Sequence, residues 1–271
     1  MAPLHGVHAL LFDVFGTVVD WHSSVVAALA AAGAGPGEHA PDWGALATEW
    51  RAGYLRTTSA PIARPSVSNV FRSLHVARGG EGPPTVDAMH REVRTSPPPC
   101  PRTHPCPQLL DELLASPRWR ALAPVWDDDT RRTLCLAWHR LHPWPDAAPA
   151  LHALKATHIV GTLSNGNVRL LVDLAKHAGL PWDVVFSSEL FGSYKPNPAV
   201  YDGAVRCLAL PPHAVVLVAA HLADCRAAKA CGLRAVYVRR ATEDIGVAVD
   251  ETHVDAVVDD FDGLARLLHV E

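Results

Sequence analysis

The fold of this chain is decided by the stretch Ala9-Leu10-Leu11-Phe12-Asp13-Val14-Phe15-Gly16-Thr17-Val18-Val19-Asp20-Trp21. An apolar run of strand length ends on the carboxylate of Asp13, and Gly16 supplies the conformational freedom that a tight turn needs. The pattern predicts that Asp13 lies at the C-terminal end of a strand, the edge where open parallel sheets bind ligands. Taken alone, Asp13 fits two roles equally well: a cap of the following turn, or a carboxylate nucleophile.

The composition is that of an ordinary folded protein. The chain has 271 residues, of which 49% are hydrophobic and 19% charged, and its formal net charge is −4. This length can bury the core of one large domain, or of a domain with a sizeable insertion. No basic block or basic stripe with interleaved aromatic residues is present, so we expect no nucleic-acid partner. The first apolar run lacks Lys and Arg and is interrupted early by Asp13, which predicts a cytoplasmic protein with no membrane partner.

The six cysteines are predicted to stay reduced. Four of them lie in helix-like segments: Cys135, Cys207, Cys225 and Cys231. The other two, Cys100 and Cys106, flank His104 in a proline-rich run, but this spacing matches no zinc pattern. We interpret the run as a plain loop.

The second half of the chain alternates short apolar segments with helical patterns. The predicted strands span 158–163, 184–187, 214–219, 235–238 and 256–258, and the predicted helices span 147–156, 167–178, 197–208, 222–231 and 261–269. This alternation is typical of a parallel sheet built by right-handed crossovers. We therefore predict an α/β fold with a Rossmann-like, doubly wound parallel sheet.

Only one predicted strand precedes residue 20, so the simplest topology places it inside the later sheet. Residues 1–20 and 143–271 then form the core domain, and residues 21–142 form an inserted, all-helical cap domain. Within this cap we expect Ser23 and Ser24 to cap a first helix that ends at residue 32, and further helices at 43–55, 108–114 and 129–141. Residues from about 78 to 108 are rich in Gly and Pro and predict a long irregular insertion.

Polar residues follow three of the later strands. Ser164 and Asn165 come first, Lys195 stands in the second of these segments, and Asp224 follows the strand at 214–219. Parallel strands end at one common edge, so these side chains are expected beside Asp13. Each also has a plain structural interpretation: Ser164 as a helix cap, Lys195 as a surface residue, and Asp224 as an acid favoured by the dipole at a helix N-terminus.

Taken in order, these segments resemble the haloacid dehalogenase superfamily, and specifically its type II 2-haloacid dehalogenase branch. The similar motifs are Phe12-Asp13-Val14-Phe15-Gly16-Thr17 for the nucleophile loop, Leu163-Ser164-Asn165-Gly166-Asn167 for the second motif, Tyr194-Lys195-Pro196 with Tyr201 for the third, Asp224 for the last, and Trp50-Arg51 for the arginine of the cap. The resemblance covers residues 7–20 and 143 to about 240, and it is much weaker across the cap.

Two departures separate the chain from the phosphatases of that superfamily. Those enzymes place a second Asp two residues after the nucleophile to protonate the leaving alcohol, whereas this chain has Phe15, which cannot transfer a proton. They also hold Mg²⁺ with an acidic pair after the fourth strand. Here Ala219, Ala220 and His221 stand where the first acid would be, and only Asp224 is left. We therefore expect neither a metal ion nor another cofactor.

A haloacid substrate is consistent with both departures, because a halide leaves without a proton. The resemblance implies metal-independent hydrolysis of short L-2-haloacids to D-2-hydroxyacids, and it allows fluoroacetate-type substrates. Asp13 would attack the halogen-bearing carbon in line, giving an ester and a free halide. Water would then hydrolyse the ester at the Asp13 carbonyl group, so that the configuration of the substrate carbon inverts once.

The resemblance also implies a role for each motif residue that acts on the nucleophile. Lys195 would keep Asp13 ionised, since an opposite charge nearby favours the carboxylate. Asp224 would orient Lys195 and help to activate the water. Ser164 and Thr17 would hold the substrate carboxylate or Asp13 in the attack geometry.

The remaining residues would bind the substrate and the halide. Arg51 and Asn165 would receive the departing halide, while Phe15 and Tyr201 would line the pocket. His221 stands where relatives often carry small polar residues. It either replaces that polar function or marks a subgroup with another substrate.

Two other functions stay open. The first is a Mg²⁺-dependent hydrolase of a small phosphorylated metabolite, which would need an acid that the sequence lacks. The second is a catalytically silent binding protein that keeps the fold. The set of Asp13, Lys195 and Asp224 argues against the second, because a buried charge cluster is costly unless it is fully paired. Relatives are often dimers, so the resemblance implies a homodimer.

Overall fold

A parallel β-sheet organises the chain. The computed structural model describes residues 4–35, 40–59, 106–249 and 251–268. Within these residues, six strands form one sheet in the order β5-β4-β1-β6-β7-β8, and each neighbouring pair is parallel. The strands are β1 (Ala9–Phe12), β4 (Ile159–Ser164), β5 (Val184–Ser187), β6 (Val215–Ala219), β7 (Arg234–Val238) and β8 (Ala256–Val258). The predicted α/β fold with a parallel sheet is confirmed.

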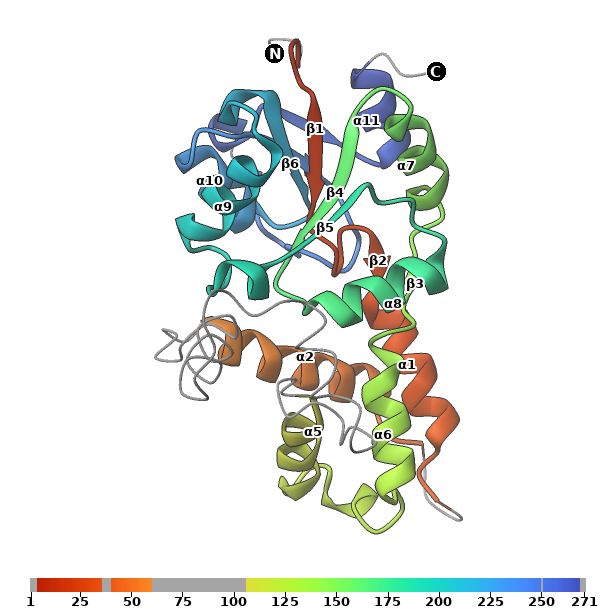
Figure 1. The fold of residues 1–271 in the computed structure, drawn as a ribbon. Helices are drawn as coiled ribbons and strands as arrows, with labels where there is room; N and C mark the ends of the chain where they lie inside the picture. The colour runs from red at the N-terminus through yellow and green to blue at the C-terminus, as the bar shows by residue number, and fades with distance from the viewer. Residues whose placement is uncertain (1–3, 36–39, 60–105, 250, 269–271) are drawn as a thin grey trace, which may run out of the picture.

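Helices cover both faces of the sheet (Figure 1). They are α7 (Ala147–Lys155), α8 (Val168–Ala178), α9 (Pro198–Leu208), α10 (Leu222–Ala230) and α11 (Phe261–Leu267). Leu10 and Phe12 of β1 belong to one apolar core together with residues of α7, α8 and α11, whereas Ala9 and Leu11 belong to the other with residues of α9 and α10. Successive side chains of a strand point to opposite faces, so β1 is apolar throughout because both faces are covered.

Among the described residues, four helices lie beyond the carboxyl ends of the strands, in the lower half of Figure 1. They are α1 (Trp21–Ala32), α2 (Trp43–Ser59), α5 (Cys106–Ala115) and α6 (Asp128–Ala137). Shorter 3₁₀ helices span Arg120–Leu122, Ser188–Phe191, Pro212–Ala214 and Glu251–His253. The expected Pro- and Gly-rich insertion, including Cys100 and His104, lies outside the described residues up to residue 105. The division into a core and a cap domain stays a prediction.

A two-stranded ribbon lies where the chain enters α1 and where it returns from α6 to the sheet. Here β2 (Val19–Asp20) pairs antiparallel with β3 (His142–Pro143). The sequence analysis did not predict this ribbon, because two residues are too short to display an alternating pattern. The ribbon brings both connections to the same side of the nucleophile loop.

Two predicted helix caps are wrong. Asp20 caps α1, because its Oδ1 accepts a hydrogen bond from the Ser23 amide at 3.0 Å, so the helix begins at Trp21 and not at Ser23 or Ser24. Asn167 caps α8 by accepting from the Leu170 amide at 2.8 Å, whereas Ser164 lies at the end of β4. In both helices the cap is the residue three positions before the amide that it binds, as capping geometry requires.

None of the helices in the described ranges combines the length and apolar character needed to cross a membrane.

Candidate active site

The carboxylate of Asp13 lies at the carboxyl end of β1 and is buried, with 7% of the residue exposed. Its backbone amide continues the sheet by donating to the Val218 carbonyl at 3.0 Å. Within the described residues, the partners of the carboxylate are the side chains of Thr17, Lys195 and His221, and no amide of the following turn binds it. The geometry therefore does not support the interpretation of Asp13 as a cap of its own turn.

Thr17 is fully buried behind the carboxylate. Its hydroxyl oxygen accepts from the Ala220 amide at 2.9 Å, and the hydroxyl donates to Asp13 Oδ2 at 2.9 Å. Because the oxygen is occupied by an amide of the neighbouring strand's end, the hydroxyl hydrogen is directed at Asp13. Thr17 thus fixes the orientation of the carboxylate.

Lys195 is buried between two carboxylates. Its ammonium donates to Asp13 Oδ1 at 2.9 Å and also to Asp224 Oδ2. Asp224 lies in the first turn of α10, where its other oxygen accepts from the Tyr201 hydroxyl. The structure therefore brings together Asp13, Lys195, Asp224 and Tyr201, as expected, although 182 positions separate Asp13 from Lys195.

These contacts decide the charges at the site. Burial by itself would raise the pKa of Asp13, but the charges and hydrogen bonds of Lys195 and His221 hold this pKa well below its usual value of 3.8. Burial opposes the ammonium form of Lys195, yet Asp13 and Asp224 raise its pKa above 10.5. Burial and the charge of Asp224 raise the pKa of Tyr201, which therefore stays a hydrogen-bond donor. At neutral pH the site presents an ionised carboxylate, the form that a nucleophile needs.

Asn165 holds the backbone around Lys195. Its Oδ1 accepts from the Lys195 amide at 2.8 Å and from the Ser188 hydroxyl at 2.7 Å, and its Nδ2 donates to the Lys195 carbonyl at 3.2 Å. Ser164, next to it, is fully buried and accepts from the Gly166 amide at 3.2 Å. Ser188 was not predicted as a site residue, although it directly follows β5 and so lies at the same edge of the sheet as Ser164.

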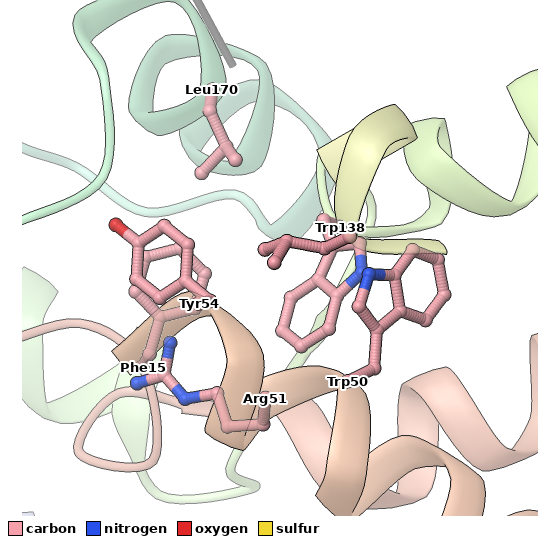
Figure 2. Close-up of a pocket in the computed structure, with 7 residues that line it drawn as sticks. Phe15, Trp50, Arg51, Tyr54, Trp138 and Leu170 are labelled. Carbon is pink, nitrogen blue, oxygen red and sulfur yellow. The ribbon is translucent and has the colours of Figure 1, made fainter. Parts of the chain in front are cut away.

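Arg51 reaches the site from α2 and lies among aromatic rings. Its guanidinium carbon is 5.1 Å from the ring centre of Phe15, 5.7 Å from that of Trp21 and 5.4 Å from that of Tyr54. Figure 2 shows the guanidinium beside Phe15 and Tyr54. Within the described residues no carboxylate pairs with Arg51, so its positive charge is available to an anion.

A cavity of about 500 Å³ joins these residues. All the predicted site residues except Thr17 line it, namely Asp13, Phe15, Arg51, Ser164, Asn165, Lys195, Tyr201, His221 and Asp224. A second pocket of about 20 Å³ adjoins it through Phe15, Arg51 and Tyr54 and is closed by apolar side chains that include Trp138 and Leu170 (Figure 2). The large cavity therefore combines the carboxylate of Asp13 and other acids with three basic side chains, Arg51, Lys195 and His221, and with apolar residues.

Glu243 is a site residue that the sequence analysis missed. Its Oε2 lies 2.8 Å from His221 Nε2, and the other ring nitrogen, Nδ1, lies 3.1 Å from Asp13 Oδ2. Trp21 Nε1 donates to Glu243 Oε1 at 2.7 Å. No motif surrounds Glu243 in the sequence. The only available signal is that it follows β7, whose carboxyl end lies at the same sheet edge as Asp13.

Gly16 makes room for Glu243. A Cβ atom at position 16 would lie 2.3 Å from Glu243 Cδ, and the backbone φ of +83° is one that side chains disfavour. The turn after Asp13 and the approach of Glu243 therefore depend on the same glycine.

His221 is held between two carboxylates. Burial would lower its pKa, but its hydrogen bonds to Asp13 and Glu243, together with their charges, raise this pKa to about 10. At neutral pH the imidazole ring is therefore positively charged. Asp13 thus has a cation on each side, Lys195 at Oδ1 and His221 at Oδ2.

Comparison with known proteins places this site in a family. A model of haloacid dehalogenase-like hydrolases matches residues 7–232. The chain belongs to this family. The structure is similar to that of the L-2-haloacid dehalogenase PA0810, with a TM-score of 0.70 and 32% identity over 97% of this chain and 99% of that one. It is equally similar to the defluorinating L-2-haloacid dehalogenase Rha0230, with a TM-score of 0.70 and 34% identity over 97% and 96% of the two chains.

The chain is also similar to curated (S)-2-haloacid dehalogenases. The (S)-2-haloacid dehalogenase H-109 of Pseudomonas putida is 27% identical over 89% of this chain and 88% of its own length. The (S)-2-haloacid dehalogenase of Pseudomonas sp. strain YL is 31% identical, but the match spans 51% of this chain and 63% of that enzyme. The resemblance inferred from the motifs is confirmed.

In this haloacid dehalogenase-like hydrolase, the Lys195 ammonium lies between Asp13 and Asp224 and forms an ion pair with each carboxylate. Among the described residues, no group of three or more His, Cys, Asp or Glu side chains is arranged to hold a metal ion. The arrangement supplies an ionised nucleophile and cations that face an anionic ligand.

Proposed function

We propose that this chain hydrolyses the carbon–halogen bond of short L-2-haloacids to give D-2-hydroxyacids and halide, without a metal ion. One observation carries the proposal: the ionised Asp13 faces a cavity that it shares with the guanidinium of Arg51. The names of the related L-2-haloacid dehalogenases, among them a defluorinating enzyme, support this chemistry.

The reaction has two steps. In the first, Asp13 attacks the halogen-bearing carbon, the carbon–halogen bond breaks, and an ester of Asp13 and a halide ion form. In the second, water attacks the carbonyl carbon of the ester, and the hydroxyacid leaves while the Asp13 carboxylate returns. The oxygen of the product comes from Asp13, and the single in-line attack inverts the configuration of the substrate carbon.

The contacts support a division of work among the site residues. Thr17 and Lys195 each hold one carboxylate oxygen of Asp13 and so favour a single attack geometry. Arg51 and the aromatic rings around it form the side of the cavity proposed to receive the halide. Asn165 keeps Lys195 in place, and we propose this positioning role in addition to contact with the halide.

Other residues that line the cavity are proposed to bind the rest of the substrate. Phe15 and Tyr201 line the cavity, and Ser164 faces the same space. Phe15 also occupies the position at which a phosphatase of the superfamily would need a proton donor. If this chain hydrolysed phosphorylated metabolites, it would therefore lack the acid that protonates the leaving alcohol.

Halide release from the two enantiomers of 2-chloropropionate tests this function. We expect release from the L-enantiomer alone, in the presence of EDTA, and no release by the Asp13→Asn variant. A parallel assay supplies Mg²⁺ and a small phosphate ester. Phosphate release without halide release would overturn the proposal and favour a phosphatase. A folded protein that is inactive in both assays would favour a binding protein.

The assembly and the domain division also stay proposals. We propose that the chain forms a homodimer, which sedimentation of the purified protein tests. The proposed core of residues 1–20 and 143–271 and the proposed cap of 21–142 meet at the β2–β3 ribbon. A cytoplasmic location stays a prediction from the sequence.

A further inference from the structure

We propose that Arg240 is a positioning residue for the nucleophile, and that it fixes the turn after Asp13 with the help of Asp146. The inference rests on the proposed function, because it concerns the first of its two steps, the attack by Asp13. Neither Arg240 nor Asp146 is among the residues that line the cavity, and neither belongs to the motifs around the site. Both therefore act on the reaction without touching the substrate.

Three consecutive backbone carbonyls of this turn accept hydrogen bonds from residues far along the chain. Trp144 donates to the Gly16 carbonyl from its indole nitrogen and to the Val18 carbonyl from its amide, both at 2.9 Å. The carbonyl between them belongs to Thr17 and accepts from Arg240 Nε at 3.0 Å. Of these three donors Arg240 is the charged one, and charged donors make the stronger hydrogen bonds.

Thr17 connects the turn to the nucleophile. Its hydroxyl donates to Asp13 Oδ2 at 2.9 Å, and the side chain is fully buried, so a shift of its backbone moves the hydroxyl as well. An in-line attack requires the carboxylate oxygen in a narrow range of positions, and a misplacement of about 1 Å can cost roughly 100-fold in rate. Arg240 therefore acts on Asp13 through the backbone of Thr17.

The guanidinium of Arg240 is itself held in one direction. Its Nη1 donates to Asp146 Oδ1 at 3.0 Å, and the side chain is 6% exposed. The guanidinium carbon lies 5.3 Å from a ring centre of Trp144 and 4.7 Å from that of Phe261. The other oxygen of Asp146 accepts from the Phe261 amide at 2.7 Å. Asp146 thus joins Arg240 to the first residue of α11.

Stability alone does not account for a charge buried at this place. A buried ion pair is often no more stabilising than apolar side chains of the same size, because both charges lose their water. Nη2 of Arg240 is also buried and has no hydrogen-bond partner in the described part of the chain, which adds to the cost. An apolar side chain could fill the same space, but it could not direct a donor at the Thr17 carbonyl.

Arg240→Met keeps the length of the side chain and removes its donors. Rapid mixing of excess enzyme with L-2-chloropropionate gives the rate of halide release at saturation and the affinity for the substrate. We expect this rate to fall by roughly 10- to 100-fold, with unchanged affinity because Arg240 does not line the cavity. A merely structural role would lower the free energy of unfolding in urea and leave the rate at saturation unchanged.

Two milder variants keep the test open if Arg240→Met fails to fold. Arg240→Lys places an ammonium near the position of the guanidinium carbon, so it should recover part of the rate at saturation, although it lacks the planar fork of donors. Asp146→Asn retains an oxygen for the Phe261 amide but removes the charge that holds Arg240. It should slow halide release by a smaller factor than Arg240→Met.

A double-mutant cycle with Thr17→Val tests the route of the effect. If Arg240 acts through the Thr17 hydroxyl, adding Arg240→Met to Thr17→Val should slow halide release much less than Arg240→Met slows the wild type, because coupled residues are not additive. Two factors that simply multiply would overturn the inference.

Asp255→Asn is the matched control. Asp255 also joins a cation to a backbone amide, since its oxygens accept from Lys229 Nζ and from the Ala235 amide, both at 2.7 Å. It precedes β8 and so lies at the opposite edge of the sheet from Asp13. This variant should keep the wild-type rate at saturation.

The two proposals fail in different ways. A wild-type rate at saturation in folded Arg240→Met and Asp146→Asn would overturn this inference and leave the dehalogenase intact. A wild-type protein that releases no halide would overturn the proposed function, and this inference with it.

Discussion

At the scale of single residues, Thr17 connects the nucleophile to the sheet. Its hydroxyl joins Asp13 Oδ2 to the amide of Ala220, which follows β6. The side chain is fully buried, so water cannot replace either hydrogen bond. The position of the Asp13 carboxylate and the stability of the sheet edge therefore depend on the same hydroxyl group.

Thr17→Val should remove both hydrogen bonds at once. The change keeps the shape but leaves the Ala220 amide without its partner, so we expect the free energy of unfolding in urea to fall by about 1–3 kcal/mol. The rate of the halide burst should also fall, because Asp13 loses a donor that fixes its orientation. Thr17→Ser should retain most of both. Equal burst rates in the Val and Ser variants would contradict the positioning role.

His221 makes stability depend on pH. Its pKa is about 10 in the folded protein, against a usual 6.5, so its contribution is fully present below pH 6.5. As pH rises, the unfolded chain loses this proton first, and the folded protein loses the stabilisation progressively up to pH 10.

Urea unfolding of the wild type and of His221→Gln measures this contribution. Between pH 6.5 and about 8.5, the free energy of unfolding of the wild type should fall by up to about 1.4 kcal/mol per pH unit relative to that of the variant. The difference between the two proteins removes the effects of the other histidines. A difference that does not change with pH would show that His221 is not protonated in the folded protein.

At the scale of secondary structure, α2 places some of its side chains in the apolar core and others at the site. Trp50 is 1% exposed and packs in the apolar core, whereas Arg51, the next residue, lines the cavity. Successive helical residues point about 100° apart, so one turn can serve both surroundings. Tyr54, one turn later, lies over the Arg51 guanidinium and donates to the Asn165 carbonyl at 2.8 Å.

Arg51→Gln tests whether α2 supplies the anion-binding group. We expect the halide burst to slow by roughly 100-fold, since a charged donor that faces a developing anion is lost. Rapid mixing with L-2-chloropropionate and halide detection measures this rate. Arg56→Gln, an exposed change near the end of the same helix, should behave like the wild type. A normal burst in Arg51→Gln would contradict the proposed role of this helix.

At the scale of the whole molecule, Trp138 connects α1 and α2 to the nucleophile loop. Its ring stacks on that of Trp21, with the ring centres 6.1 Å apart. The ring centres of Trp50 and Phe15 lie 5.6 Å and 6.4 Å from that of Trp138. These partners come from α1, α2 and the loop after β1. The contact therefore links the proposed cap to the proposed core beside the cavity.

Trp138→Ala should lower the free energy of unfolding by about 3–5 kcal/mol, because a buried aromatic ring is removed. Trp138→Phe should cost less, since Trp138 Nε1 has no hydrogen-bond partner among the described residues. Urea unfolding measures both variants. The Ala variant should also raise KM, as Trp138 lines the small pocket next to Arg51. Equal stability of the two variants would contradict this packing role.

Local pattern by itself determined much of this protein. The apolar run that ends on Asp13, the alternation of strands with helices, and the ordered motifs around Ser164, Lys195 and Asp224 were all visible in the sequence. Strand and helix periods and glycine turns are local properties, and the edge of a parallel sheet brings strand ends together whatever their separation along the chain.

Only the tertiary structure decided the contacts that complete the site. Glu243 binds His221 across 22 positions, and Asn165 holds the backbone of Lys195 across 30. The caps of α1 and α8 and the β2–β3 ribbon also depended on it. Such contacts follow from the path of loops and from the exact offset of one side chain to one amide. No periodic pattern encodes either of them, so they appear only when the chain is folded.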